Sequence, residues 1–334
     1  FEIPTRNNRA HTVRFGYHHM NGGTSLFRHN YVENSNPTSS PSGSDHAVYL
    51  ASGSASSYGV ASGSATFEHN TVVLTGSNNV CAGFIIDMNV RNSAVVNIRL
   101  NKFRLHALSA AEGVAFVRKA DVQLIDDGKL NIHDNTGIIT ADIGAKCEFF
   151  HESQTQATSI EGEISIARNI AQLGPCDLVN VISVQQKTLT NLISVRDNVF
   201  HASARSTGNN HMFFMNQITV DAPGASDPHF EVERNEFVCH STNPDSQCRL
   251  AFFDNVIGSS IVHTVTISEN KVLSASPSTA LLYVGTACDT EYAIWTVTSN
   301  CLRWEKHTET DWRSRGLHIV ATTLENVPID FRFN

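Results

Sequence analysis

The chain has 334 residues, of which 41% are hydrophobic, and a formal net charge of −8 at pH 7. The apolar content is enough for a sizeable core, whereas the acidic balance gives no support for a nucleic-acid or anionic-membrane partner. No apolar run approaches the roughly 20 residues of a membrane-spanning helix, and the chain starts with neither an initiator methionine nor a signal peptide, so we expect a processed product or a fragment.

The first clear feature along the chain is an asparagine motif, which begins at Phe27/Asn30 and continues to Val297/Asn300. In each copy an apolar residue lies three positions before an asparagine, and an apolar or small residue lies two positions after it. The stretch Ile193–Phe200 (I-S-V-R-D-N-V-F) is a clear example. Nine copies spaced 29 to 40 residues apart indicate a repeat array, and their asparagines are Asn30, Asn70, Asn101, Asn135, Asn169, Asn198, Asn235, Asn270 and Asn300.

A second apolar run lies between successive motifs, so each repeat has at least two short strands. No repeat has the period of a long helix, which disfavours a leucine-rich repeat, and the variable repeat length disfavours a propeller. The pattern predicts an all-β fold, a right-handed parallel β-helix (solenoid) of roughly nine to ten coils and roughly 45 Å in length. The runs are Ala47–Leu50, Phe84–Ile86, Val114–Val117, Cys147–Phe150, Leu178–Ile182, Met212–Met215, Leu250–Phe253, Ala280–Val284 and Leu317–Val320.

Stacked coils would bring the nine asparagines into a ladder, because coils stack at about 4.8 Å and each amide can donate to one neighbour and accept from the other. Asparagine also tolerates the left-handed conformation that a sharp bend between strands needs. The alternative is that each asparagine merely marks a turn. We favour the ladder, because a turn alone would accept glycine or aspartate at some of the nine positions.

Stacking also predicts charge pairs between neighbouring coils. The residue before the asparagine alternates in sign along one part of the chain, and the preceding position does the same over Arg28, Glu68 and Arg99. Near the N-terminus, His29 is expected to lie over His69, and we favour a simple stack of exposed rings over a metal site. The alternating series is Asp134, Arg168, Asp197, Arg234 and Glu269.

The repeat requires only one domain, residues 1–334. We divide it into an N-terminal start at 1–20, regular coils at 21–300, and a divergent last coil at 301–334. The chain ends in a strand-like run, Ile329–Phe333, without an evident cap. An open strand edge pairs readily with other strands, so we expect the remainder of a longer chain or another copy of this chain to adjoin it end to end.

The seven cysteines contain no C-x-x-C pair, which leaves structural zinc and redox motifs without support. Cys147 and Cys176 occupy the same place in adjacent coils, within disulfide range. Two further pairs could close local loops and would leave Cys81 unpaired; the alternative is that all seven are reduced. The candidate disulfide pairs are Cys147 with Cys176, Cys239 with Cys248, and Cys288 with Cys301.

No catalytic, cofactor or metal motif stands out. The best local candidate is Asp126-Asp127-Gly128, where two carboxylates could serve as acid and base, but a polar turn is the favoured interpretation. The element sets typical of polygalacturonases and pectate lyases are absent, as are P-loop, G-x-S-x-G and H-E-x-x-H patterns.

Short strands that end in R-D-N-V-F, E-R-N-E-F, S-E-N-K-V and R-L-N-K-F carry a resemblance to a known family. These stretches are Arg196–Phe200, Glu233–Phe237, Ser268–Val272 and Arg99–Phe103. The cadence resembles the dispersed gene family of kinetoplastid surface proteins. This resemblance implies a β-helical, adhesin-like ectodomain within a very large protein, and it implies no catalytic residues.

We therefore expect a non-enzymatic extracellular module at the cell surface, either adhesive or structural, without cofactors. It would belong to a large surface protein or stack end to end into a filament, with glycans as candidate ligands, no nucleic-acid partner and no membrane insertion. The alternative is a carbohydrate-active β-helix, such as a polysaccharide lyase, a hydrolase or a viral tailspike-like depolymerase. Fold alone does not decide between these functions.

Overall fold

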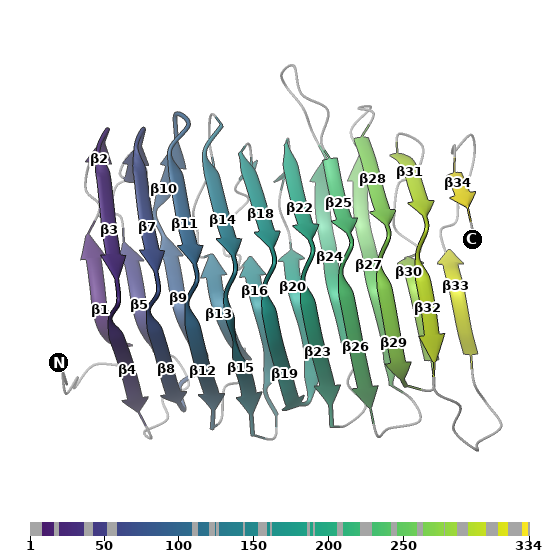
Figure 1. The fold of residues 1–334 in the computed structure, drawn as a ribbon, viewed down its shortest axis with the longest axis horizontal. Coiled ribbons are helices and arrows are strands. Elements are labelled where there is room, and N and C mark those ends of the chain that lie inside the picture. Colours follow the sequence, from purple (N-terminus) through teal and green to yellow (C-terminus); the bar gives the residue numbers. More distant parts are fainter. Residues whose placement is uncertain are drawn as a thin grey trace.

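The computed structural model describes residues 9–16, 20–36, 43–51, 59–108, 113–119, 124, 127–142, 144–152, 159–160, 162–185, 188–189, 191–205, 210–220, 229–241, 246–258, 263–276, 278–285, 293–304, 313–319 and 329–332. Across these residues the protein is an all-β parallel β-solenoid that contains no helix (Figure 1). Neighbouring strands of each long sheet come from successive repeats, so each of these sheets extends along the solenoid axis.

Three long parallel sheets form the walls. The ten-stranded sheet consists of β3 (Thr24–Arg28), β7 (Ser64–Glu68), β11 (Val95–Arg99), β14 (Lys129–His133), β18 (Glu163–Ala167), β22 (Leu192–Arg196), β25 (His229–Glu233), β28 (His263–Ser268), β31 (Ala293–Thr298) and β34 (Ile329–Arg332). The nine-stranded sheet consists of β4 (Tyr31–Asn36), β8 (Thr71–Gly76), β12 (Lys102–Ala107), β15 (Thr136–Ala141), β19 (Ile170–Cys176), β23 (Val199–Ala204), β26 (Glu236–Ser241), β29 (Lys271–Ala275) and β32 (Cys301–Trp304).

The third wall is the twelve-stranded sheet, and the second apolar run of every repeat lies in it, apart from Val320, which is outside the described residues. It consists of β1 (Arg9–Gly16), β5 (Ser44–Ala51), β9 (Val80–Asp87), β13 (Gly113–Lys119), β16 (Lys146–Glu152), β20 (Leu178–Gln185), β24 (Asn210–Val220), β27 (Gln247–Gly258), β30 (Ser278–Val284) and β33 (Arg313–Ile319), with the short strands β17 (Ser159–Ile160) and β21 (Thr188–Leu189). A small three-stranded sheet joins β2 (Met20–Asn21), β6 (Gly59–Ala61) and β10 (Asn89–Arg91).

Alternation along the strands puts one apolar face inside. In β11, Val96 and Ile98 are fully buried while Asn97 points outward. The parallel register then stacks like on like, because Ile98 pairs with Phe67 in one neighbouring strand and with Ile132 in the other. A single hydrophobic core results, which runs the length of the solenoid and is closed to water.

The corner at each motif differs from expectation in one respect. The residue before the asparagine, not the asparagine itself, takes the left-handed conformation, with φ between 51° and 58° at all nine corners. This arrangement leaves the asparagine side chain pointing inward, where it can hydrogen-bond. The nine left-handed residues are His29, His69, Leu100, Asp134, Arg168, Asp197, Arg234, Glu269 and Ser299.

Candidate functional site

The nine asparagines of the motif lie one above another at the corner between the ten-stranded and nine-stranded sheets; we call them the asparagine column. The Asn135 side-chain oxygen accepts from both the backbone N–H and the amide Nδ2 of Asn101, each at 3.0 Å. Asn135 in turn donates in the same two ways to Asn169, at 3.0 Å. The same pair of bonds joins every neighbouring pair from Asn30 to Asn300.

A further bond accounts for the apolar residue of the motif. The Asn135 Nδ2 also donates to the backbone oxygen of Ile98, at 2.8 Å, and Ile98 lies three residues before the previous asparagine. Asn135 is fully buried, so these bonds occur where water cannot substitute for them. The apolar residue of the motif thus has two roles: its side chain packs in the core, and its backbone carbonyl accepts a hydrogen bond from the asparagine of the next coil.

Charge pairs link neighbouring coils at the same corner. Arg168 contacts Asp134 at 2.8 Å, and Arg234 contacts Asp197 at 2.8 Å. The Arg168 guanidinium holds the pKa of Asp134 below its usual value. One position earlier, Arg99 contacts Glu68 at 2.7 Å. These side chains are substantially exposed, so each pair contributes about 0–1 kcal/mol and acts mainly on register.

The two predicted histidines also stack. The rings of His29 and His69 are parallel within 10°, with centroids 5.1 Å apart. No group of three or more His, Cys, Asp or Glu side chains with metal-binding geometry occurs among the described residues. Of the Asp126-Asp127 candidate, Asp126 lies outside the described residues, and Asp127 takes a left-handed turn conformation with φ 60°.

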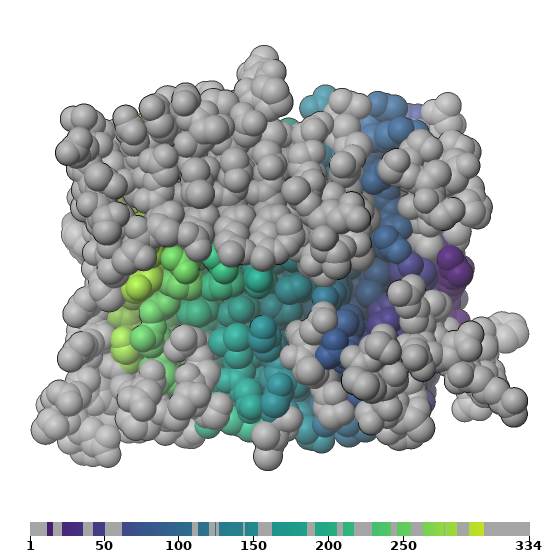
Figure 2. All heavy atoms as spheres, turned by 180° about the vertical axis from the view of Figure 1, so that it is seen from behind, coloured from purple at the N-terminus to yellow at the C-terminus, as the bar shows by residue number. Residues whose placement is uncertain are grey.

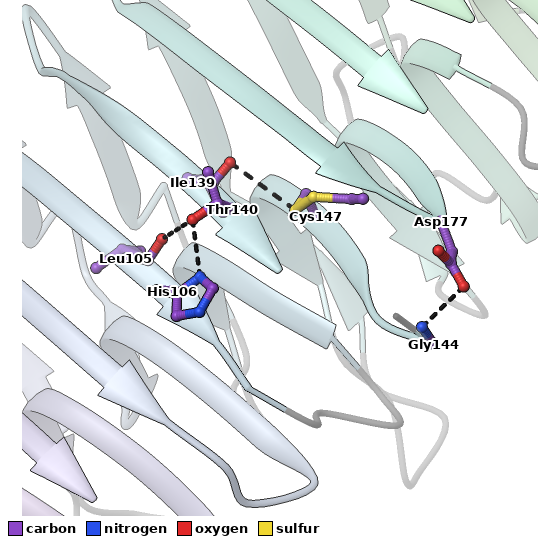
Figure 3. The surroundings of a disulfide bond; sticks show 8 residues. Leu105, His106, Ile139, Thr140, Gly144, Cys147 and Asp177 are labelled. Carbon is purple, nitrogen blue, oxygen red and sulfur yellow. Dashed lines mark hydrogen bonds between the residues drawn. A yellow bond between two sulfur atoms is a disulfide. The ribbon is translucent and has the colours of Figure 1, made fainter. Parts of the chain in front are cut away.

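Two of the predicted disulfides are present. Cys147 bonds to Cys176 across adjacent coils with a Cα separation of 6.0 Å, and Cys239 bonds to Cys248 at 6.3 Å. All four residues are buried. Figure 3 shows Cys147 beside further cross-coil contacts, among them Gly144, whose N–H donates to Asp177 at 2.8 Å. These disulfides add covalent links to the hydrogen-bonded stack.

The third predicted disulfide is not formed. Cys301 is a free, exposed thiol at the start of β32, and Cys288 lies outside the described residues. Cys301 pairs in register with Lys271, a surface residue of β29, so its side chain points away from the core where the other disulfides lie. Cys81 is free and buried, and burial together with the charge of Asp45 raises the pKa of its thiol.

The outer face of the twelve-stranded sheet has a feature that the motif does not reveal, a bend within the strands. In β13, Phe116 and Val117 both belong to the core, whereas Ala115 and Arg118 on either side do not. The Cα register with β9 includes Ala115 and Val117 but omits Phe116. Two consecutive inward residues break the alternation of a strand, so the outward side chains before and after the bend converge.

Two rows of side chains therefore follow the solenoid axis on this outer face. Figure 2 views the molecule from the side of this sheet, and its coloured residues run from yellow-green at one end to purple at the other. The His46 row precedes the bend and contains His46, Ala82, Ala115, Glu148, Asn180, His211, Arg249 and Ala280. The Tyr49 row follows the bend and contains Tyr49, Ile85, Arg118, His151, Ser183, Phe214, Phe252 and Tyr283.

Contacts across the bend join the two rows. His151 Nδ1 lies 2.9 Å from a carboxylate oxygen of Glu148, which is almost fully buried. The distance between Nδ1 and the carboxylate oxygen fits an ion pair. The angle is too poor for a hydrogen bond, so Nδ1 has no hydrogen-bond partner. The rings of His46 and Tyr49 also approach, with centroids 5.6 Å apart. At these two places the strip between the rows is lined by polar and aromatic groups.

Toward the C-terminal end the rows form a cluster of three rings, a histidine and an arginine, which we call the Arg249 cluster. Arg249 lies over Phe252 and Tyr283, with its Cζ 4.5 Å and 3.9 Å from their centroids. His211 stacks on Phe252 and on Phe214, with centroids 4.9 Å and 5.5 Å apart. The cluster is therefore preorganised by ring contacts on both sides of the bend.

Burial shapes the charges of this cluster. It lowers the pKa of Arg249 to about 10, and it holds the pKa of His211 well below its usual value, with the Arg249 charge adding to that effect. Arg249 remains a cation at neutral pH, whereas His211 is neutral and hydrogen-bonds Asn180 at 3.0 Å through Nδ1. The cluster thus presents one fixed positive charge.

An ion pair also occurs inside the solenoid. Lys119 and Glu152 occupy neighbouring core positions in β13 and β16, and their side chains are fully buried with Nζ and Oε1 2.7 Å apart. Neither residue was singled out from the sequence, because their strands end in polar residues as many surface strands do. The rows of the outer face were missed as well, since the bend inverts the alternation on which face assignment depends.

No family model, no curated protein and no solved structure matches this chain. Among the described residues no helix is long and apolar enough to cross a membrane.

Proposed function

We propose that this chain is a non-enzymatic extracellular module, structural or adhesive, built as a right-handed stack of nine to ten coils whose asparagine column is a continuous ladder. It is part of a large surface protein or a subunit that stacks end to end into a filament. The resemblance to the kinetoplastid dispersed gene family agrees with a surface role. The cross-coil bonds of the asparagine column support it, because they stiffen the stack along its whole described length.

The disulfides support an oxidising compartment. Such bonds persist in extracellular proteins and are rare in the cytosol. Here one of them, Cys147–Cys176, joins two coils, and so adds resistance to unravelling that a module exposed outside the cell needs. The ion pairs between Asp134 and Arg168 and between Asp197 and Arg234 disfavour a slipped stack, because a skipped coil would bring like charges together.

The adhesive role rests on one observation, the converging rows of the outer face. Partly exposed rings beside charged and amide groups are a composition that binding surfaces favour, and Phe214, Phe252 and Tyr283 are neighbours there. Most members of the rows are buried, but Phe214, Arg249, Phe252 and Tyr283 are partly exposed and follow one another along the solenoid axis. An extended partner such as a glycan chain fits this shape.

Two measurements test the proposal. Negative-stain electron microscopy at several concentrations should give single rods, or filaments one solenoid wide if the ends pair. A glycan array probed with the intact chain should give binding that the double substitution Phe214→Ala/Phe252→Ala removes, while Ile138→Ala, an exposed apolar residue of β15, leaves it intact. Compact particles together with no glycan binding would contradict the proposal.

A carbohydrate-active enzyme is the second candidate, and one pair of residues favours it. A carboxylate oxygen of Glu148 lies 2.9 Å from His151 Nδ1, and Arg118 pairs in register with His151 from the neighbouring strand. A rotation of the imidazole that aligned it with Glu148 would give a carboxylate-oriented imidazole, which is a competent general base. Incubation with polysaccharides, followed by a count of new reducing ends, tests it: turnover that His151→Gln abolishes would establish the enzyme and overturn the non-enzymatic role.

A further inference from the structure

We propose that the Arg249 cluster binds the carboxylate of an acidic polysaccharide that lies along the outer face of the twelve-stranded sheet. This inference rests on the proposed adhesive function and names the class of ligand. The cluster is the part of the two rows where a fixed cation and several rings occur together.

The first argument is the way in which Arg249 is held. The guanidinium lies over the rings of Phe252 and Tyr283 and hydrogen-bonds Gln247. An arginine stacked in this way loses little further side-chain freedom on binding, and its planar fork matches a carboxylate in two parallel hydrogen bonds. Stacking against rings leaves the in-plane N–H groups directed sideways, which is where a bidentate partner approaches.

The second argument concerns charge. Arg249 is partly desolvated, which lowers its pKa to about 10, and in the described part of the chain no carboxylate lies within ion-pair distance of it. Asp254 acts on it only as a longer-range charge. A desolvated cation without a direct counter-ion interacts strongly with an incoming anion, because the surrounding medium screens the interaction less than bulk water does.

The third argument is that the neighbouring groups suit a sugar. His211 stays neutral, so it adds no second charge that would favour a dianion such as phosphate. The Phe214 and Phe252 rings lie 5.2 Å apart, and the Phe252 and Tyr283 rings 4.8 Å apart, along the solenoid axis. Partly exposed ring surface provides apolar contact for the C–H groups of a pyranose.

The fourth argument is periodicity. Each coil advances the surface by about 4.8 Å, and the rings of Phe214, Phe252 and Tyr283 repeat at like positions in the successive strands β24, β27 and β30. A linear polymer laid along the axis therefore passes all three rings. A small free acid would contact only the groups next to Arg249, so binding is expected to strengthen with chain length over these three coils.

The experiment compares acidic polymers with their own methyl esters, which share the backbone and lack the charge. Polygalacturonate, alginate and hyaluronan are titrated by calorimetry into the intact chain and into Arg249→Met, Arg249→Lys and Arg104→Met. Arg104 is an exposed arginine of β12 on the nine-stranded sheet, so it controls for the loss of one positive charge. Thermal unfolding of each variant verifies that the fold is retained.

At least one polymer is expected to bind the native chain ten times more tightly as the acid than as the ester. Arg249→Met should remove that difference, Arg249→Lys should keep part of it, and Arg104→Met should leave it unchanged. Equal binding of acid and ester to the native chain, or a preference that survives Arg249→Met, overturns the inference but not the adhesive function. Absence of binding to every polymer, charged or esterified, contradicts both.

Discussion

Replacing Asn135 with alanine tests how much of the stability depends on the asparagine column. The side chain accepts two bonds from Asn101 and donates one each to Asn169 and to the Ile98 carbonyl, all between 2.8 and 3.0 Å. Alanine leaves two buried donors without a partner, the Asn101 N–H and one Asn101 amide hydrogen, and removes one bond to the Ile98 oxygen. At about 1–3 kcal/mol for each unpartnered donor, the loss should be about 2–6 kcal/mol.

The matched control is Asn131→Ala. Asn131 lies in β14, four residues earlier, and its amide also donates to an asparagine, Asn97, at 3.0 Å. It points outward and is only partly buried, so water replaces the lost bond, and we expect a loss of about 1 kcal/mol or less. The comparison therefore keeps the chemistry constant and varies burial.

The assay must report locally, because a solenoid interacts mainly with its neighbours and need not unfold in one step. Amide hydrogen exchange resolved to individual strands suits this, together with urea unfolding. Asn135→Ala should lower the protection of β11, β14 and β18 and leave β28 and β31 almost unchanged. Similar losses for Asn135→Ala and Asn131→Ala would refute the reasoning that buried amides fix the corner.

Three further predictions concern buried charge, backbone strain and acid. Lys119→Met should destabilise the fold by about 3–5 kcal/mol, because it leaves the Glu152 carboxylate buried without its ammonium partner. The double variant Lys119→Met/Glu152→Leu should recover most of that loss. Urea unfolding measures both variants, and a double variant no more stable than the single one would argue against the ion pair. Leu100 is 41% exposed and has a φ of 55°. The left-handed region costs a non-glycine residue about 1–2 kcal/mol, so Leu100→Gly should raise the midpoint temperature of unfolding. An unchanged or lower midpoint temperature would contradict this prediction. The pKa of His211 is held well below its ordinary 6.5, so below pH 6.5 the unfolded chain binds a proton that the folded chain does not, and stability should fall as the pH drops below about 6.5. His211→Phe should reduce that fall in a series of unfolding curves between pH 7 and 4, and an identical pH dependence in both proteins would exclude His211 as its source.

Much of the scaffold could be predicted from the sequence, because in a solenoid each residue contacts its equivalents in neighbouring repeats. The requirement for asparagine at the position of Asn198 is therefore repeated in every coil, and it appears in the sequence as a short motif. The Cys147–Cys176 disulfide follows from the same reasoning, since cysteines at like places in adjacent coils lie near each other. Closeness in the chain predicted Cys239–Cys248 correctly, but it also predicted Cys288–Cys301, and Cys301 is free.

The candidate binding surface could not be predicted in this way. In a regular strand every second residue faces the core. In β13, however, Phe116 and Val117 both point inward, so beyond the bend the residues that alternation would place inside lie outside, and the reverse. Arg118 consequently falls on the outer face while Lys119 falls inside. The left-handed corner residues show the same limit: the sequence indicated a bend at each asparagine, and only the backbone geometry placed it one residue earlier.

The sequence by itself thus determined a repeating β-fold, the residues that stack at each corner and the cross-coil link between Cys147 and Cys176, because these depend on the period of the chain and on contacts between like positions. The tertiary structure alone decided which polar and aromatic side chains converge: Glu148 with His151, and Arg249 with Phe252 and Tyr283. The physical reason is that such convergence depends on where a strand bends, and a bend is set by how core side chains of several coils pack together and not by any local pattern.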